Sequence, residues 1–276
     1  MRATKRRRVM LLAGMFIGLL WALAWHSARA DNPRPGKSYD IYLLIGQSNM
    51  AGRGTVDAES KQIDPRVFML DKDNQWAPAT DPLHFDKPSV AGVGPGLAFG
   101  KAMADASPQA TVGLVPCAVG GTSISVWSPG KHDPATGTYP YDDMLKRIKI
   151  ALNDGTLKGI IWHQGESDRS PKASAVYADR LTELVARLRK DLDAPNVPFV
   201  AGELGQFNEN NRVETTQMNE ILNGLDKRIP NYACVSADGL TDRGDHLHFN
   251  TDSARKLGVR YAEAMEKLQG ENQRAK

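Results

Sequence analysis

The chain has 276 residues, of which 41% are hydrophobic and 24% are charged, and its formal net charge is +3. This amino-acid composition is that of an ordinary globular protein, and it excludes disordered, collagen-like and coiled-coil chains. A chain of this length can bury one large core, so a second domain is not required. The two cysteines, Cys117 and Cys234, are too few for a disulfide scaffold, and whether they pair stays open.

The first 30 residues have the three parts of a secretory signal peptide. Basic residues near the start precede an apolar run over residues 9–25, and Ala28-Arg29-Ala30 resembles a cleavage site. We therefore predict a signal peptide over residues 1–30, a linker over residues 31–37, and a secreted or periplasmic protein. The alternative is an uncleaved anchor, because a run of about 17 residues is at the short limit for a membrane span.

Cleavage would also change the charge of the protein. It removes six basic and no acidic residues, so 35 basic and 32 acidic residues become 29 and 32, a net charge of −3. With a negative net charge, the protein would not attract the phosphate backbone of a nucleic acid, so we expect no nucleic-acid partner. No stable membrane insertion is expected after cleavage, and the oligomeric state is unknown.

From residue 38 onward, apolar runs alternate with amphipathic segments. The runs lack the polar alternation of a half-exposed strand, so each is typical of a strand buried on both faces. Strands that alternate with helices predict a parallel sheet, because parallel neighbours need a crossover connection. The expected strands cover residues 39–45, 111–115, 159–162, 197–201 and 232–236, and the expected helices cover residues 97–106, 141–152, 173–192, 214–225 and 251–268.

These elements predict a doubly wound, three-layer α/β/α fold whose central, mainly parallel sheet has about five strands. One domain over residues 38–270 accounts for them, followed by a polar tail over residues 271–276. In such sheets ligands bind beyond the carboxyl ends of the strands. The residues that follow each apolar run are therefore the candidates for chemistry.

Ser48 follows the first apolar run, within Gly46-Gln47-Ser48-Asn49-Met50. A serine between a strand and a turn of helix can expose its hydroxyl at the strand end, where backbone N–H groups can face a developing oxyanion. Ser48 is therefore a candidate nucleophile. The alternative is that its side chain only caps the turn.

Two more segments place polar or flexible residues after a strand. Gly120-Gly121 can let a backbone N–H approach a ligand closely because no Cβ intervenes, or it can form only a tight turn. Gln164 follows the run over residues 159–162 and is a candidate amide donor into the pocket. For His163 and Glu166 we favour a satisfied local network, because a buried polar group left unpaired costs about 1 to 3 kcal/mol.

Asp245 and His248 lie three residues apart before the last expected helix. The carboxylate can hold one imidazole nitrogen while the other faces a serine hydroxyl, which is how a base activates a weak nucleophile. His246 is the rival base, and Asp242 and Glu166 are the rival acids. Asp245 and the two histidines are also candidate zinc ligands, but no cysteine pair or His-Glu-x-x-His helix completes a site. We therefore expect no metal and no cofactor.

Four segments together resemble the SGNH-hydrolase superfamily and follow its order along the chain. Within it they are similar to the branch of sialate O-acetylesterases and carbohydrate esterase family six, which includes acetylxylan esterases. The segments are Gly46-Gln47-Ser48-Asn49-Met50, Gly120-Gly121-Thr122-Ser123, Trp162-His163-Gln164-Gly165-Glu166-Ser167 and Asp245-His246-Leu247-His248-Phe249.

The resemblance implies a serine esterase that removes O-acetyl groups from a carbohydrate through an acyl-enzyme. Ser48 matches the nucleophile, His248 the general base and Asp245 the acid that orients the base. The enzyme that the resemblance implies is a carboxylic ester hydrolase that needs no cofactor.

The resemblance also implies an oxyanion hole with three donors. The N–H groups of Ser48 and Gly121 match the first two donors, with Gly120 as the alternative to Gly121. Gln164 matches the third donor, at a position where many members of the superfamily have asparagine. Glutamine is the usual residue in this branch.

The expected substrate is an O-acetylated carbohydrate, and xylan, sialic acid and related glycans are not separated. We expect substrate contacts from Gln47, Asn49, Trp127 and Glu166, with Trp127 in an exposed region that stacks on a sugar, or else partly buried. The long segment over residues 51–93 is expected to shape the pocket rim. Two other classes stay open, namely a noncatalytic carbohydrate-binding protein on an esterase scaffold and a metal-dependent hydrolase.

Overall fold

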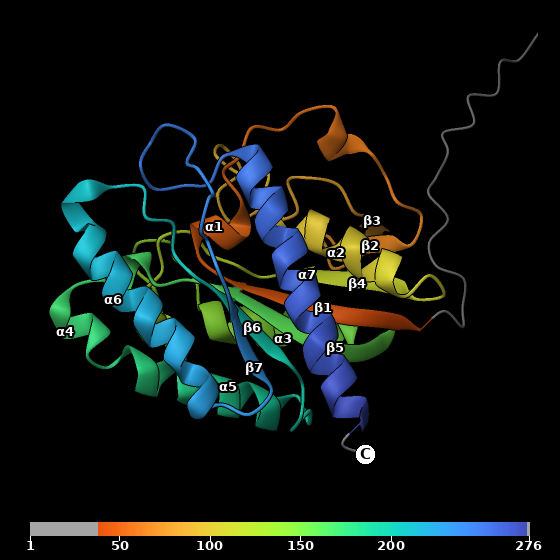
Figure 1. The fold of residues 1–276 in the computed structure, drawn as a ribbon. Helices are drawn as coiled ribbons and strands as arrows, with labels where there is room; N and C mark the ends of the chain where they lie inside the picture. The colour runs from red at the N-terminus through yellow and green to blue at the C-terminus, as the bar shows by residue number, and fades with distance from the viewer. Residues whose placement is uncertain (1–37, 275–276) are drawn as a thin grey trace, which may run out of the picture. The chain divides into compact units, whose positions relative to one another are not determined.

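The computed structural model describes residues 38–274 of the chain. The predicted signal peptide and linker, over residues 1–30 and 31–37, lie outside the described residues. Across the described range, no helix has both the length and the apolar composition that a membrane span requires. This part of the chain forms one central sheet with helices on both of its faces (Figure 1).

Seven strands form the sheet in the order β3-β2-β4-β1-β5-β6-β7. All neighbours are parallel except β2 and β3, which are antiparallel. β1 lies at the centre, where it pairs with β4 from Tyr39↔Thr111 onward and with β5 up to Gly46↔His163. The strands are β1 (Tyr39–Gly46), β2 (Val67–Leu70), β3 (Trp76–Pro78), β4 (Thr111–Pro116), β5 (Gly155–His163), β6 (Phe199–Gly202) and β7 (Tyr232–Val235).

The helices form one layer on each face of the sheet. α2 and α7 contribute to the core on one face, and α3, α5 and α6 contribute to the core on the other. The helices are α1 (Ser48–Ala51), α2 (Pro95–Ala106), α3 (Pro140–Ala151), α4 (Pro171–Ser174), α5 (Tyr177–Asp191), α6 (Arg212–Asn223) and α7 (Thr251–Arg274), and the short 3-10 helices are η1 (Glu59–Lys61), η2 (Ile124–Val126), η3 (Glu166–Asp168), η4 (Glu209–Asn211) and η5 (Gly224–Lys227).

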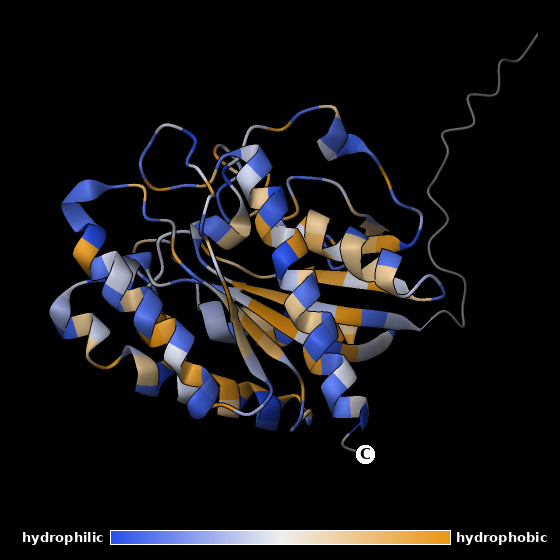
Figure 2. Cartoon of the chain, in the orientation of Figure 1, coloured by the Kyte–Doolittle hydropathy of each residue, from blue (hydrophilic) through white to orange (hydrophobic). Residues whose placement is uncertain are grey.

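The side chains of β1 alternate between the two cores. Ile41, Leu43 and Ile45 belong to the core under α3, α5 and α6, whereas Tyr42 and Leu44 belong to the core under α2 and α7. Because both faces are covered, successive side chains are all buried, which explains the unbroken apolar run. The central strands are accordingly largely hydrophobic, while the helices alternate hydrophobic and hydrophilic residues (Figure 2).

The predicted three-layer α/β fold with a mainly parallel sheet is confirmed, but the sheet has seven strands rather than about five. The two strands that the sequence did not indicate, β2 and β3, are four and three residues long. They lie at one edge of the sheet, where β2 is an apolar run of only four residues and β3 has three half-buried residues, so neither gives a strong strand signal.

Two predicted helix boundaries differ from those in the structure. The helix predicted over residues 173–192 is wrong at its start, because the chain leaves the helical path between α4 and α5, where Val176 is 38% exposed. α7 continues to Arg274, through most of the segment predicted as a polar tail. Cys117 and Cys234 are both free thiols.

α7 packs very closely against α2 at Gly258. A Cβ atom at this position would overlap the carbonyl oxygen of Pro95 and would lie 2.9 Å from both Ala98 Cβ and Phe99 N. Gly270, on the same helix, has open space instead, because the nearest atom to its Cβ position is 3.9 Å away. The two glycines of α7 therefore differ in what a methyl group would meet.

We expect Gly258→Ala to lower the free energy of unfolding by about 1 to 3 kcal/mol, because overpacking outweighs the helix propensity gained from alanine, about 1 kcal/mol. Gly270→Ala is the matched control and should be neutral or stabilising. Urea unfolding followed by circular dichroism measures both changes. Equal midpoints for the two variants would contradict the close packing of α2 and α7.

Candidate active site

The end of β1 places Ser48 directly beyond the carboxyl edge of the sheet. Gly46 has a φ of 130°, and a Cβ there would overlap the carbonyl oxygen of His163, so only glycine fits. The N–H of Gln47 donates to that same carbonyl at 2.8 Å, which holds the ends of β1 and β5 together. Ser48 then begins α1 at the centre of the sheet.

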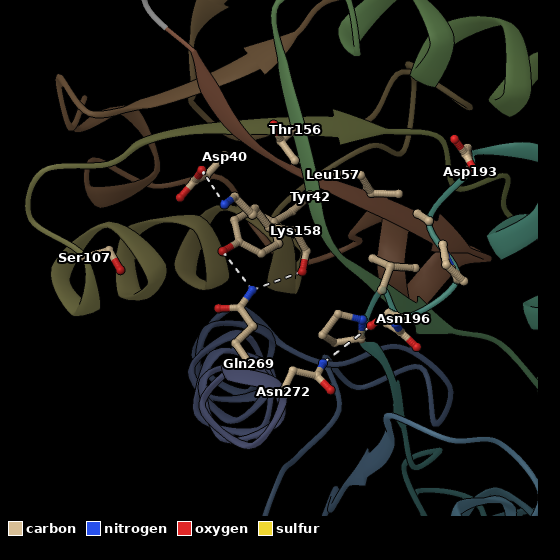
Figure 3. Close-up of a pocket in the computed structure, with 14 residues that line it drawn as sticks. Asp40, Tyr42, Ser107, Thr156, Leu157, Lys158, Asp193, Asn196, Gln269 and Asn272 are labelled. Carbon is tan, nitrogen blue, oxygen red and sulfur yellow. Dashed lines mark hydrogen bonds and ion pairs between the residues drawn. The ribbon is translucent and has the colours of Figure 1, made fainter. Parts of the chain in front are cut away.

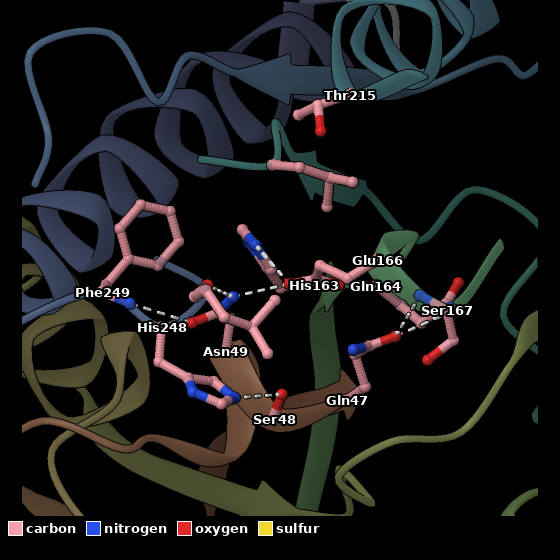
Figure 4. A network of polar contacts seen from close by, with 12 residues as sticks. Gln47, Ser48, Asn49, His163, Gln164, Glu166, Ser167, Thr215, His248 and Phe249 are labelled. Carbon is pink, nitrogen blue, oxygen red and sulfur yellow. Dashed lines mark hydrogen bonds and ion pairs between the residues drawn. The ribbon is translucent and has the colours of Figure 1, made fainter. Parts of the chain in front are cut away.

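Ser48, His248 and Asp245 form a continuous chain of contacts. Ser48 Oγ lies 3.0 Å from His248 Nε2 (Figure 4), and His248 Nδ1 lies 2.8 Å from Asp245 Oδ2. An ionised carboxylate only accepts hydrogen bonds, so Nδ1 carries the proton and Nε2 is left to accept from the serine hydroxyl. The structure thus brings together the three residues that the sequence predicts as nucleophile, base and acid, although Ser48 and His248 are 200 positions apart.

The carboxylate of Asp245 is fixed by the backbone that follows it. Its Oδ1 accepts from the N–H groups of Leu247 at 3.0 Å and His248 at 2.8 Å. Partial burial favours the protonated acid, but the hydrogen bonds outweigh it and hold the pKa of Asp245 below its ordinary value. The rival base, His246, has a side chain that is 68% exposed, and its Nδ1 lies 3.8 Å from Asp242 Oδ2.

Asn49 connects the nucleophile turn to the histidine loop. Its Oδ1 accepts from the N–H of Phe249 at 3.1 Å, and its Nδ2 donates to the carbonyl of Leu247 at 3.1 Å and to Glu166 Oε1 at 2.6 Å (Figure 4). Asn49 is buried and does not line the pocket at Ser48. The expectation that it contacts substrate is therefore not met, because these three partners occupy its amide.

Two backbone N–H groups beside the nucleophile are open. Within the described part of the chain, neither the N–H of Ser48 nor that of Gly121 donates to an acceptor. The N–H of Gly120 instead donates to Asp86 Oδ2 at 2.8 Å. A Cβ at Gly120 would lie 3.5 Å from Ser48 Cβ, so this turn packs against the nucleophile. The open pair, Ser48 and Gly121, is suited to bind an oxyanion.

Asp86 holds this glycine turn in place through a buried ion pair. Its Oδ2 also lies 2.8 Å from Arg53 Nη2, and the two side chains are almost fully buried. Burial by itself would raise the pKa of Asp86, but the hydrogen bond from Arg53 outweighs it and the pKa is lowered. Sequence reasoning did not identify Asp86, because an acid within an irregular segment has neither a motif nor a periodicity that marks it.

Gln164 does not face the pocket. It is fully buried, and its Nε2 lies 2.6 Å from Asp168 Oδ2, 3.1 Å from the carbonyl oxygen of Thr122 and 3.1 Å from Gln47 Oε1. An amide has two hydrogens, and these acceptors take both. The expected donation from Gln164 into the pocket is therefore not met.

A pocket of about 380 Å³ opens at Ser48 and His248. Its lining residues are Gln47, Ser48, Arg53, Lys87, Val90, Gly120, Gly121, Glu166, Ser167, Arg169, Leu247 and His248. Two of the expected substrate contacts, Gln47 and Glu166, are among them. The segment over residues 51–93, which was expected to shape the pocket rim, contributes Arg53, Lys87 and Val90 to the lining.

A larger hollow, of about 640 Å³, lies at the opposite edge of the sheet (Figure 3). It is lined by the start of β1, including Asp40, and by the end of α7, including Gln269 and Asn272. No histidine lines it. The pairing of a nucleophile with a base therefore points to the smaller pocket at the carboxyl edge.

Trp127 is not the exposed aromatic face that was expected. It is 1% exposed, its indole N–H donates to Thr122 Oγ1 at 3.1 Å, and its ring packs edge-on against Trp162 at 5.3 Å. The prediction that it stacks on substrate is therefore wrong. Tyr139 is 44% exposed but does not line the pocket.

The expected local network of His163 and Glu166 forms only in part. His163 Nδ1 lies 3.0 Å from the hydroxyl of Tyr261, whereas its Nε2 has no hydrogen-bond partner among the described residues and lies 3.8 Å from Glu166 Oε1. Burial lowers the pKa of His163, so the ring is neutral. Glu166 is bound by Asn49 instead.

The fold and the site together define a class of protein. A serine, a histidine and an aspartate in hydrogen-bonded sequence, beside open N–H groups at the carboxyl edge of a parallel sheet, have the arrangement of a Ser-His-Asp hydrolase. The family model described as carbohydrate esterase, sialic acid-specific acetylesterase matches residues 38–267, and the chain belongs to this family. The predicted enzyme class, a carboxylic ester hydrolase that acts as a carbohydrate O-acetylesterase, is thereby confirmed.

Individual relatives agree with this family. A protein of Arabidopsis thaliana named "Probable carbohydrate esterase" is 34% identical over 244 residues, which are 81% of this chain and 89% of that protein. Its solved structure is similar with a TM-score of 0.71, at 33% identity over 82% of this chain and 97% of that one. The sialate O-acetylesterase of Homo sapiens is 31% identical over 165 residues, 47% of this chain and 31% of that protein. The crystal structure of NanS, 19% identical, has a TM-score of 0.70 over 85% of this chain and 98% of that one, and supports the fold alone.

We expect Asp245→Asn to lower kcat for 4-nitrophenyl acetate by several orders of magnitude. The amide keeps an oxygen for the two backbone N–H groups, but its NH2 then faces His248 Nδ1 and favours the tautomer whose Nε2 cannot accept the serine proton. Asp242→Asn is the matched control in the same loop, because its Oδ2 accepts from the backbone of Gly244 and His246. A larger loss from Asp242→Asn or from Glu166→Gln would mean that another residue is the acid.

Proposed function

We propose that the chain is a serine esterase that removes O-acetyl groups from a carbohydrate through an acyl-enzyme, and that its N-terminal segment directs export. The observation that carries the esterase proposal is the hydrogen-bonded chain from Ser48 Oγ through His248 to Asp245, at a pocket with two open N–H groups. The basic and apolar composition of residues 1–30 supports export.

In the first half of the proposed reaction, His248 Nε2 takes the proton of Ser48 while Oγ attacks the acetyl carbonyl carbon. The carbonyl electrons move to the oxygen, which becomes an oxyanion facing the N–H groups of Ser48 and Gly121. As the oxyanion collapses, the bond to the sugar oxygen breaks and His248 gives its proton to that oxygen. The products of this half are the free sugar hydroxyl and acetyl-Ser48.

In the second half, water replaces the sugar. His248 takes a proton from the water, the hydroxide attacks acetyl-Ser48, and the same N–H groups face the second oxyanion. Collapse breaks the bond to Ser48 Oγ, which recovers its proton from His248, and acetate leaves. Asp245 holds the imidazole in one orientation through both halves and stabilises its positive charge.

The charges around the pocket favour an acidic sugar as the substrate. Lys87 and Arg169 line the pocket, and neither forms an ion pair with a carboxylate among residues 38–274. Lys87 Nζ lies 3.7 Å from the Cβ position of Gly121, and Arg169 donates to the backbone carbonyl of Glu166 and to Thr215 Oγ1. Unpaired cations at a binding site attract and hold anions, so we propose an O-acetylated sugar that carries a carboxylate, such as a sialic or uronic acid.

Ser48→Ala is expected to abolish acetate release from O-acetylsialic acid, acetylxylan and 4-nitrophenyl acetate, because no other residue replaces the nucleophile. The unfolding midpoint should stay the same. A serine-directed organophosphate should modify the unaltered protein at residue 48 alone, as mass spectrometry would detect. Activity that survives in Ser48→Ala but is lost on chelation would indicate a metal-dependent hydrolase. Sugar binding without hydrolysis by the unaltered chain would indicate a noncatalytic binding protein.

Lys87→Gln and Arg169→Gln are each expected to raise KM for O-acetylsialic acid by about tenfold, equivalent to about 1.4 kcal/mol of lost binding. KM for a neutral acetylated xylooligosaccharide should stay the same, because that substrate has no carboxylate. Lys149→Gln, on the exposed surface of α3, controls for a general change of charge. Equal effects on the acidic and the neutral substrate would contradict the proposed preference.

A further inference from the structure

The structure assigns the third oxyanion donor to the side-chain amide of Gln47, with Gln164 as the residue that positions it. This inference rests on the proposed esterase reaction. It concerns which amide faces the developing negative charge. Gln164, the residue expected in that role, is fully buried and does not line the pocket.

A chain of hydrogen bonds fixes which atom of Gln164 is the nitrogen. The indole N–H of Trp162 donates to the Tyr177 hydroxyl at 3.2 Å, and that hydroxyl shares its one hydrogen between the Gln164 carbonyl oxygen at 2.8 Å and Gln164 Oε1 at 3.0 Å. On the other side of the amide, Asp168 Oδ2 and the Thr122 carbonyl are acceptors only. The amide nitrogen must therefore face Asp168 and Thr122.

The orientation of Gln164 in turn fixes the orientation of Gln47. Gln164 Nε2 lies 3.1 Å from Gln47 Oε1, and the N–H of Ser167 approaches the same oxygen at 3.4 Å. The N–H of Ser167 can only donate, and the NH2 of Gln164 offers no acceptor, so the atom of Gln47 that faces both must be the oxygen. The NH2 of Gln47 is therefore the end of the amide that turns away from Gln164 and Ser167.

That NH2 has no protein acceptor. Among the residues that the structure describes, nothing accepts a hydrogen bond from Gln47 Nε2, and the atom is not among the buried unpaired polar atoms. Gln47 lines the same pocket as Ser48, Gly121 and His248, and its backbone directly precedes the nucleophile (Figure 4). A free amide donor next to the attacking oxygen is suited to stabilise the negative charge that forms on the substrate.

The test compares two substitutions of Gln47 that keep different parts of its chemistry. Gln47→Glu keeps the oxygen that faces Gln164 and Ser167 but replaces the NH2 with a second oxygen. Gln47→Met removes both polar ends and adds no charge. We expect Gln47→Met to lower kcat by about a hundredfold, the usual effect of losing one such donor, with a small change in KM. Gln47→Glu should lose at least as much, because it places a negative charge beside the oxyanion.

Two substrates separate an oxyanion donor from a residue that binds the sugar. 4-Nitrophenyl acetate has the same acetyl group as O-acetylsialic acid but no sugar, so loss of an oxyanion donor should lower kcat for both substrates alike. Gln62→Met makes the same chemical change on the exposed surface and should leave kcat unchanged. If Gln47→Met lowers kcat only for the sugar ester, Gln47 binds the leaving group and the assignment is overturned.

A double variant tests the role of Gln164 as a positioning residue. Because Gln164 is proposed to act only through Gln47, adding Gln164→Met to Gln47→Met should lower kcat little further. Losses that multiply would make Gln164 an independent donor and overturn the assignment. Ser48→Ala keeps the outcomes distinct: if it is inactive while the Gln47 variants are fully active, only this inference fails, and if it is active, the esterase mechanism itself fails.

Discussion

The position of the histidine base depends on the side chain of Asn49. One buried amide binds the backbone on both sides of His248, through Leu247 and Phe249, and also binds the carboxylate of Glu166. If the histidine loop moved away, the buried amide would lose its partners, at a cost of about 1 to 3 kcal/mol for each group left unpaired. Arg243 adds a second connection, since it donates to the carbonyl of Arg53 at 2.6 Å. The distance between Ser48 and His248 is thus set by polar contacts outside the reacting atoms.

The two halves of the site are held by different physical means. On the base side, backbone N–H groups and the imidazole converge on the partly exposed carboxylate of Asp245. On the oxyanion side, the buried ion pair of Arg53 and Asp86 fixes the glycine turn. A buried ion pair contributes little net stability, and removal of one partner is strongly destabilising. The Arg53–Asp86 pair therefore makes the glycine turn rigid more than it makes the protein stable.

The sequence predicted most where burial on both faces leaves a simple pattern. Five of the seven strands and the positions of Ser48, His248 and Asp245 follow from apolar runs and from the residues that come after them. β2 and β3 were not predicted, because four apolar residues in β2 and three half-buried residues in β3 are too short to indicate a strand by themselves. The burial of Trp127 depends on Trp162 of β5, which only the folded chain brings to it.

Which glutamine faces the pocket was equally out of reach of the sequence. Gln47 and Gln164 have the same side chain, and both follow a strand that ends at the site. The orientation of Gln164 is set by Asp168, four residues further along the chain, and by the carbonyl of Thr122, which only the fold brings to it. A motif can name the residues of a site, but the direction of an amide depends on its neighbours in space.

The direction of β1 and α7 bears on how the protein can be handled. β1 runs toward the pocket and α7 runs away from it, so the described chain begins and finishes at the edge of the sheet that carries the larger hollow (Figure 1). With 24 residues, α7 extends about 36 Å from the histidine loop. A tether to a bead, an electrode or a carrier protein at either of these positions would leave the mouth of the pocket turned toward the solution.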